Sequence, residues 1–203
     1  MDVEPLVTAF VALFVVIDPV GLAPLFVALT RGVPADTRRG IALRACATAA
    51  ALLTLFGLFG EQVLGFLGIS LPAFRIAGGV LLFLTALDML FERRTARRKA
   101  QTAEEDPSVF PLATPLIAGP GAIATMILLT GSAPGAVGVL AIHLVMFGVV
   151  ALVLAFCLAA GLIERLLGAT GINVVTRLLG MLLAALSVQF VLDGLEGFRF
   201  GPG

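Results

Sequence analysis

The sequence predicts an all-α membrane protein of six transmembrane helices, arranged as two inverted-topology repeats of three helices. Three observations lead to this class. The 203-residue chain is 60% hydrophobic and 13% charged, and its mean hydropathy is +1.12. Six apolar runs are close to the length of about 20 residues that a helix needs to cross the hydrocarbon core. Two of these runs carry Pro and Gly near their middle, at corresponding positions of the two halves.

The first helix is expected at about 5–30 and is interrupted near its midpoint by Asp18, Pro19 and Gly21. A helix in lipid must satisfy its backbone amides internally, whereas Pro removes a donor and Gly loosens the backbone. Irregular backbone at this depth persists only where it is buried in protein or lines a polar cavity. We therefore predict that the first helix is discontinuous.

The other helices follow from the remaining apolar runs, which lie at about 40–59, 71–91, 110–130, 138–163 and 172–195. The run at 110–130 carries Gly119, Pro120 and Gly121 near its middle. By the same argument as for the first helix, this fourth helix is expected to be discontinuous.

The two halves of the chain match each other at nearly constant offsets of 100 to 103 residues. The matching pairs are Gly21 and Gly121, Leu29 and Leu129, Thr30 and Thr130, Arg75 and Arg177, Gly78 and Gly180, Gly68 and Gly171, and Ile69 and Ile172. Each half has three helices, an odd number, so the second half enters the membrane in the opposite orientation. We therefore divide the chain into a first repeat at 1–91, a charged linker at 92–109 and an inverted second repeat at 110–203.

Basic residues are concentrated in two connections. The loop after the first helix holds Arg31, Arg38 and Arg39, and the linker holds five basic residues between Arg93 and Lys99. The positive-inside rule places both connections in the cytoplasm and therefore both termini outside. Binding of anionic lipid head groups is the alternative explanation for these clusters.

Three motifs, which together span most of the chain, resemble a known family. They are Phe14-x-x-Ile17-Asp18-Pro19-x-Gly21-x-x-Pro24-x-Phe26-x-x-Leu29-Thr30, Gly68-Ile69-Ser70-x-x-x-Phe74-Arg75-Ile76-Ala77-Gly78-Gly79 and Pro111-Leu112-Ala113-x-Pro115-Leu116-x-x-Gly119-Pro120-Gly121. They are similar to the signatures of the MarC family of integral membrane proteins. The resemblance implies a cytoplasmic (inner) membrane protein of six helices, and some relatives are regarded as transporters of small neutral amino acids such as glycine and alanine.

The predicted substrate site lies between the two breaks. Its residues are Asp18, Pro19, Val20, Gly21, Gly119, Pro120, Gly121 and Thr125. Amides at the start of each second half-helix suit a carboxylate, and carbonyls at the end of each first half-helix suit an ammonium group. Glycine permits close approach, so a small zwitterionic amino acid fits. The alternative is that these Pro and Gly residues only bend helices for packing, and that Thr125 only bonds within its helix.

Asp18 is the most informative single residue, because a carboxylate near the bilayer centre is costly and therefore indicates function. It could bind the substrate ammonium, carry a proton or sit protonated. The structural alternative is that it caps the second half-helix, since Asp is a good N-cap.

Three other polar residues in apolar runs have a structural and a functional interpretation. Arg75 and Arg177 either snorkel to the interface or take part in gating. His143, the single histidine, is either a satisfied structural residue or part of a proton relay.

These features predict a secondary transporter that moves small neutral amino acids by alternating access, with protons or sodium ions as candidate coupling ions. A passive channel or an efflux component for small metabolites is the alternative. We expect no enzymatic activity and no cofactor, because the chain lacks an HExxH or CxxC metal motif and a nucleophile elbow. A net charge of zero argues against nucleic acid as a partner, and a homo-oligomer is left open.

Overall fold

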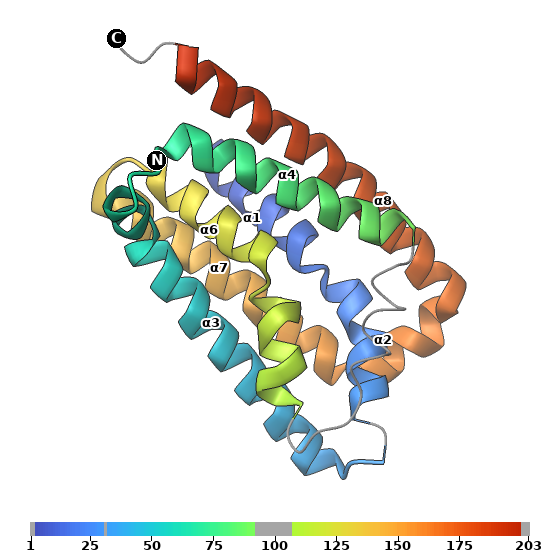
Figure 1. Cartoon of the computed structure of the whole chain (residues 1–203). Coiled ribbons are helices and arrows are strands. Elements are labelled where there is room, and N and C mark those ends of the chain that lie inside the picture. Colours follow the sequence, from blue (N-terminus) through green and yellow to red (C-terminus); the bar gives the residue numbers. More distant parts are fainter. Residues whose placement is uncertain (1–2, 31, 92–106, 200–203) are drawn as a thin grey trace.

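A computed structural model describes residues 3–30, 32–91 and 107–199 of the chain. These residues form helices joined by short connections, without a β-strand in the described part (Figure 1). The predicted charged linker at 92–109 lies outside the described residues except for its last three positions.

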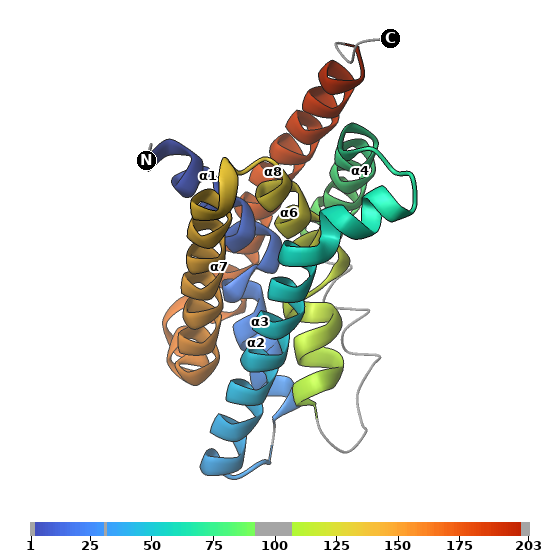
Figure 2. The same ribbon diagram turned by 90° about the vertical axis from the view of Figure 1, so that its left-hand side faces the viewer.

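The first half contains four helical elements. They are α1 (Val3–Ile17), α2 (Pro19–Leu29), α3 (Ala35–Phe66) and α4 (Leu71–Leu90). The first two are separated by the single residue Asp18 and together form one candidate membrane span. This span is more buried than the other candidate spans and packs against α7 (Figure 2).

The second half also contains four helical elements. They are η1 (Ser108–Ile117), α6 (Pro120–Gly131), α7 (Gly135–Leu158) and α8 (Ala160–Arg199). The short η1 is a π-helical segment in which Phe110 and Thr114 have extended dihedral angles. Among the described residues there are five candidate spans, or six if η1 and α6, which meet at an angle of 55°, form one bent span.

Two helices are longer than the apolar runs predicted. α3 continues from Ala35 to Phe66, because Glu61 and the residues after it are compatible with a helix, although this helix was expected to span only about 40–59. It ends just before Gly68, whose φ of +69° suits the turn. α8 begins at Ala160 and bends at Gly168, whereas its start was expected near residue 172.

Some local features occur in both halves, 100 residues apart. Gly68 and Gly168 both have positive φ; Gly68 lies in the connection before α4, and Gly168 lies at the bend within α8. A threonine near the end of α2 and another near the end of α6 donate equivalent bonds within the helix. These bonds run from Thr30 Oγ1 to Phe26 O (2.7 Å) and from Thr130 Oγ1 to Met126 O (2.8 Å).

α4 and α8 pack along each other in opposite directions, as Figures 1 and 2 show. A Cβ atom on Gly79 of α4 would lie 2.7 Å from Ser187 O of α8. A Cβ atom on Gly180 of α8 would lie 3.4 Å from Ala86 O of α4. The two glycines therefore make reciprocal close contacts, which small residues permit at helix interfaces in membranes.

Large apolar side chains cover the outward surfaces of the long helices. Examples are Leu84 on α4, Leu144 on α7 and Leu178 on α8, each more than half exposed. Exposed surfaces of this kind suit contact with lipid, in agreement with the length and hydropathy of the spans.

Candidate functional site

Asp18 adopts a left-handed conformation, with φ 57° and ψ 66°, between the last residue of α1 and the first residue of α2. Left-handed backbone is uncommon for residues other than glycine, and Asp and Asn are the side chains that tolerate it best. The Asp18 side chain accepts a hydrogen bond from Gly21 N–H at 3.0 Å. Asp18 therefore caps α2, as the structural interpretation of this residue predicted.

The carboxylate of Asp18 is deeply buried, since the residue is only 1% exposed. Gly21 makes this position possible, because a Cβ atom at residue 21 would lie 2.2 Å from Asp18 Oδ2 and 2.8 Å from Asp18 Cγ. The Gly21 amide was expected to receive a substrate carboxylate. In this structure it donates instead to the chain's own carboxylate.

The second break lies at Ala118 and Gly119, and it differs from the first. Ala118 N–H donates to Ala113 O at 2.8 Å, which closes the wide turn of η1. Gly119 is the N-cap of α6, and no side chain among the described residues caps this helix. The first turn of α6 therefore presents amide donors without a side-chain acceptor, at the positive end of the helix dipole.

The two breaks lie next to each other in the bundle. A Cβ atom on Gly121 would lie 3.3 Å from Val16 Cγ1 of α1 and 3.2 Å from Leu82 Cδ2 of α4. The hydroxyl oxygen of Thr85 on α4 would be 3.6 Å from the same atom. Val16 precedes Asp18 by two residues, so the start of α6 faces the segment that leads into the first break.

The structure brings most of the predicted site residues into the interior. Asp18, Pro19, Val20, Gly119, Gly121 and Thr125 are buried, Gly21 is partly buried and Pro120 is exposed. Thr125 is fully buried, but its hydroxyl donates to Gly121 O at 2.9 Å. Its bond within the helix matches the structural alternative for this residue.

Sequence reasoning missed Val16, Leu82 and Thr85, which surround Gly121. Val16 and Leu82 are apolar residues in apolar runs, so no sequence signal distinguishes them from their neighbours. Thr85 could have been found only by predicting which face of α4 meets α6.

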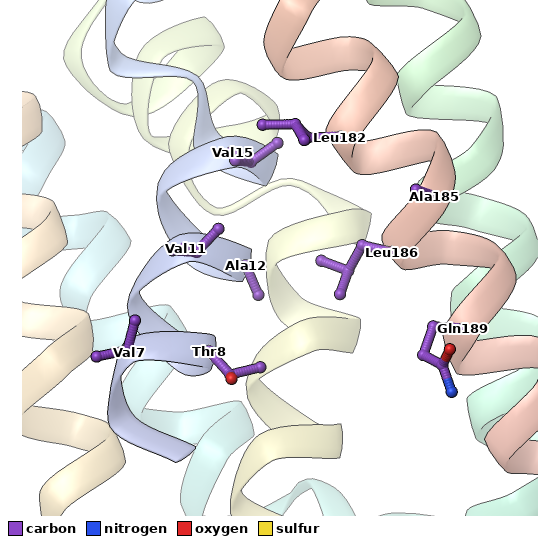
Figure 3. A pocket seen from close by; sticks show the side chains of 9 residues that line it. All are labelled: Val7, Thr8, Val11, Ala12, Val15, Leu182, Ala185, Leu186 and Gln189. Carbon is purple, nitrogen blue, oxygen red and sulfur yellow. The ribbon is translucent and has the colours of Figure 1, made fainter. Parts of the chain in front are cut away.

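A cavity of about 410 Å³ lies between α1 and α8 (Figure 3). Aliphatic side chains form most of its lining, and Thr8 and Gln189 are its two polar residues. None of the described residues that line it belongs to the predicted site. Val15, three residues before Asp18, is the lining residue of α1 closest in sequence to the first break.

Arg75 contacts the residue after α6 and neither of the two breaks. Arg75 Nη2, near the start of α4, donates to Ser132 Oγ, which follows the end of α6. This contact joins α4 to the end of α6, so the Arg75 side chain has a partner within the protein and does not only extend to the membrane interface.

Cys46 and Cys157 are free and buried. No group of residues that could hold a metal ion is found in the described part of the chain.

The sequence pattern of the MarC family integral membrane proteins matches residues 3–198. The chain belongs to the MarC family. It is 36% identical to a UPF0056 membrane protein of Methanocaldococcus jannaschii, over 97% of this chain and 98% of that protein. It is 35% identical to the UPF0056 inner membrane protein YhgN of Escherichia coli, with the same coverage of both chains.

A third MarC relative, a UPF0056 membrane protein of Aquifex aeolicus, is 36% identical over 94% of this chain and 92% of that protein. The printed names of these relatives give a membrane location and no substrate. No solved structure matches the chain. The family and the membrane-spanning architecture are thus established, and the substrate has to be argued from the site.

Proposed function

We propose that this MarC protein is a secondary transporter of small neutral amino acids, which it binds between the two helix breaks. The observation that carries the proposal is the pairing of opposite electrostatic features there. Asp18 supplies a buried carboxylate, and the adjacent α6 begins without a side-chain cap. A buried ionisable group within a membrane span indicates a functional site.

A zwitterionic amino acid matches both features. Its ammonium group binds Asp18, because a carboxylate accepts several hydrogen bonds and can cap Gly21 at the same time. Its carboxylate binds the amides in the first turn of α6, where the helix dipole favours an anion. Val16 and Leu82 lie close to Gly121, and this close packing favours a substrate with a small side chain.

We propose further that the protein consists of two inverted repeats, with the discontinuous spans α1–α2 and η1–α6 as equivalents. The counterparts α3 and α7 pack against each other, as do α4 and α8, and the two discontinuous spans meet through α1 and α6. The reciprocal contacts of Gly79 and Gly180 support an antiparallel relation between equivalent helices. Two repeats that rock against each other around a central site would provide alternating access.

The orientation belongs to the same proposal. The loop that precedes α3 and the linker between the halves face the cytoplasm, and both termini face outside, because Arg31, Arg38 and Arg39 lie in or next to the first connection and five basic residues lie in the second. The inner membrane is the proposed location, in line with the printed name of YhgN. Protons are the proposed coupling ion, and we propose no nucleic-acid partner, enzymatic activity or cofactor.

The cavity between α1 and α8 favours a second candidate function. Its mostly aliphatic lining suits an apolar molecule better than a zwitterion. A channel or an efflux component that accepts apolar metabolites would use this cavity and would not need Asp18.

Equilibrium binding of radiolabelled alanine to the purified protein tests the proposed site. Unlabelled glycine should compete, whereas propionate, which lacks the ammonium group, and ethylamine, which lacks the carboxylate, should compete at least about 10-fold more weakly. This follows because each compound forgoes one charge-assisted bond. Competition by propionate and ethylamine at the potency of glycine would refute recognition of a zwitterion.

A further inference from the structure

His143 is a buried imidazole on α7 that has a fixed orientation and is 5% exposed. Its Nδ1 atom lies 2.8 Å from Val139 O in the preceding turn. A carbonyl oxygen only accepts hydrogen bonds, so Nδ1 must carry the proton that is donated. In the neutral ring Nε2 is then a bare acceptor.

The Nε2 atom has no hydrogen-bond partner among the described residues. An unsatisfied buried acceptor loses its hydrogen bonds to water without compensation, so native structures rarely keep one without a functional reason. The neighbouring helix leaves space for this atom. A Cβ atom on Gly57 of α3 would lie 2.8 Å from Nε2 and 2.9 Å from Met126 Cε of α6.

The contacts known around Nε2 carry no charge. α2 and α6, which pack against α7, contain no titratable residue. The titratable residues of the other packed helices are Glu4 on α1, Asp36, Arg38, Arg39, Arg44, Cys46 and Glu61 on α3, and Glu164, Arg165, Arg177, Asp193, Glu196 and Arg199 on α8. Glu61 is nearest to Gly57 along α3, one helical turn further on, and it is exposed.

We infer that His143 Nε2 binds the proton that couples transport, which makes His143 a site distinct from the substrate site at Asp18. This inference rests on the proposed transport function. In the step, the Nε2 lone pair takes a proton from hydronium on the acidic side and forms imidazolium. Release of the same proton to water on the other side restores the neutral ring. Nδ1–H stays bound to Val139 O throughout.

The division of roles follows from the surroundings of the two groups. The side chain of Asp18 is committed to capping α2, and its negative charge is what an ammonium group requires. A neutral imidazole can accept a proton on Nε2 while Nδ1 keeps its own hydrogen bond. A change in the packing of α3 and α6 around Gly57 would give a proton access to Nε2.

Nitrogen NMR on protein labelled with ¹⁵N-histidine, reconstituted in liposomes and purified with a histidine-free tag, tests proton binding directly. The chain has one histidine, so one pair of ring nitrogens is observed. At about pH 8 the proton should be on Nδ1, and on acidification to about pH 5 a second N–H should appear on Nε2. A ring that stays neutral at about pH 5, or that carries its neutral proton on Nε2, would overturn the inference.

Alanine transport by His143→Gln tests the coupling. The variant should lose accumulation driven by a proton gradient and should keep wild-type alanine counterflow, which needs no net proton movement. Gradient-driven accumulation at the wild-type level would refute the role of His143. Gly57→Ala should also impair accumulation, because the new Cβ atom would lie against Nε2 of His143. Gly148→Ala on α7 should not, because a Cβ atom there has no neighbour within 4 Å. If wild-type protein shows no alanine counterflow, the proposed function fails, and the NMR titration still decides whether Nε2 binds a proton.

Discussion

Asp18 combines a left-handed backbone with a buried carboxylate in a membrane span. The left-handed conformation costs roughly 1–2 kcal/mol for a residue with a side chain. The hydrogen bond to Gly21 N–H offsets part of this cost, but a neutral N-cap such as Ser or Asn would provide a comparable bond. The proposed binding of an ammonium group uses the negative charge of Asp18, which a neutral cap would not supply.

Asp18→Asn isolates that charge. Asn tolerates left-handed backbone and caps helices about as well as Asp, so the variant should fold normally. Loss of a charge-assisted bond to ammonium costs about 1.5–3 kcal/mol, so the dissociation constant for alanine should rise roughly 10- to 150-fold. Binding titrations at matched protein levels provide the measurement. An unchanged dissociation constant would leave Asp18 as a helix cap only.

The loss of stability caused by replacing Gly21 should depend on whether Asp18 is present, and a double-mutant cycle measures this dependence. In the wild-type background Gly21→Ala places a Cβ atom against the carboxylate and should destabilise the protein by about 1–3 kcal/mol. In an Asp18→Gly background the clash is absent, and glycine suits the positive φ, so the same change should cost less.

Thermal unfolding in detergent compares the four proteins of this cycle. Additive effects of the two substitutions would show that Gly21 is required for a reason other than room for the Asp18 side chain.

At the scale of the elements, the two breaks differ in how the helix after each of them is capped. α2 is capped by a carboxylate from its own chain, and α6 begins at Gly119 without a side-chain cap. Near-identical N-termini would have produced two competing anion sites. In the proposed function, the asymmetry provides one site for an anion at the start of α6 and one negative charge for a cation at Asp18.

Gly121→Leu tests whether the start of α6 belongs to the binding site. The Cβ atom alone would lie 3.2–3.3 Å from Leu82 and Val16, so a leucine must displace these neighbours into the space between the breaks. Alanine binding should be lost. Gly148→Leu is the matched control, because a side chain at residue 148 meets open space. Binding of alanine by the folded Gly121 variant at wild-type affinity would place the pocket elsewhere.

Sequence alone drew attention to the regions around Asp18 and Gly119, where the structure places the ends of α1 and η1 and the starts of α2 and α6, since Pro and Gly mark where a helix in lipid loses its hydrogen bonds. It did not predict that α3 reaches Phe66, because Glu61 is equally compatible with a helix and with a polar return. It could not predict that Gly21 N–H is occupied by Asp18, or that Nε2 of His143 faces Gly57, because these contacts depend on side-chain conformation and helix packing.

At the scale of the whole molecule, the inverted-repeat proposal fixes which connections share a side of the membrane. The connection before α3 should be cytoplasmic and the connection before α7 should be outside, because three membrane crossings separate them. An additional or a missing crossing would contradict the repeat. Single cysteines at Ala35 and Ala136 show on which side of the membrane each connection lies. Cys46 and Cys157 are replaced by alanine in this background. A membrane-impermeant maleimide added to whole cells should label the second position only. Labelling of both positions would overturn the topology.

Alanine counterflow tests the central claim, that this MarC protein is a carrier for small neutral amino acids, most directly. Proteoliposomes loaded with excess unlabelled alanine are diluted into a trace of labelled alanine, without any ion gradient. A carrier that alternates around one site predicts a transient accumulation of label inside, which saturates with alanine concentration and is reduced in Asp18→Asn. Equilibration of label at a rate that is independent of internal alanine would contradict the account and indicate a channel.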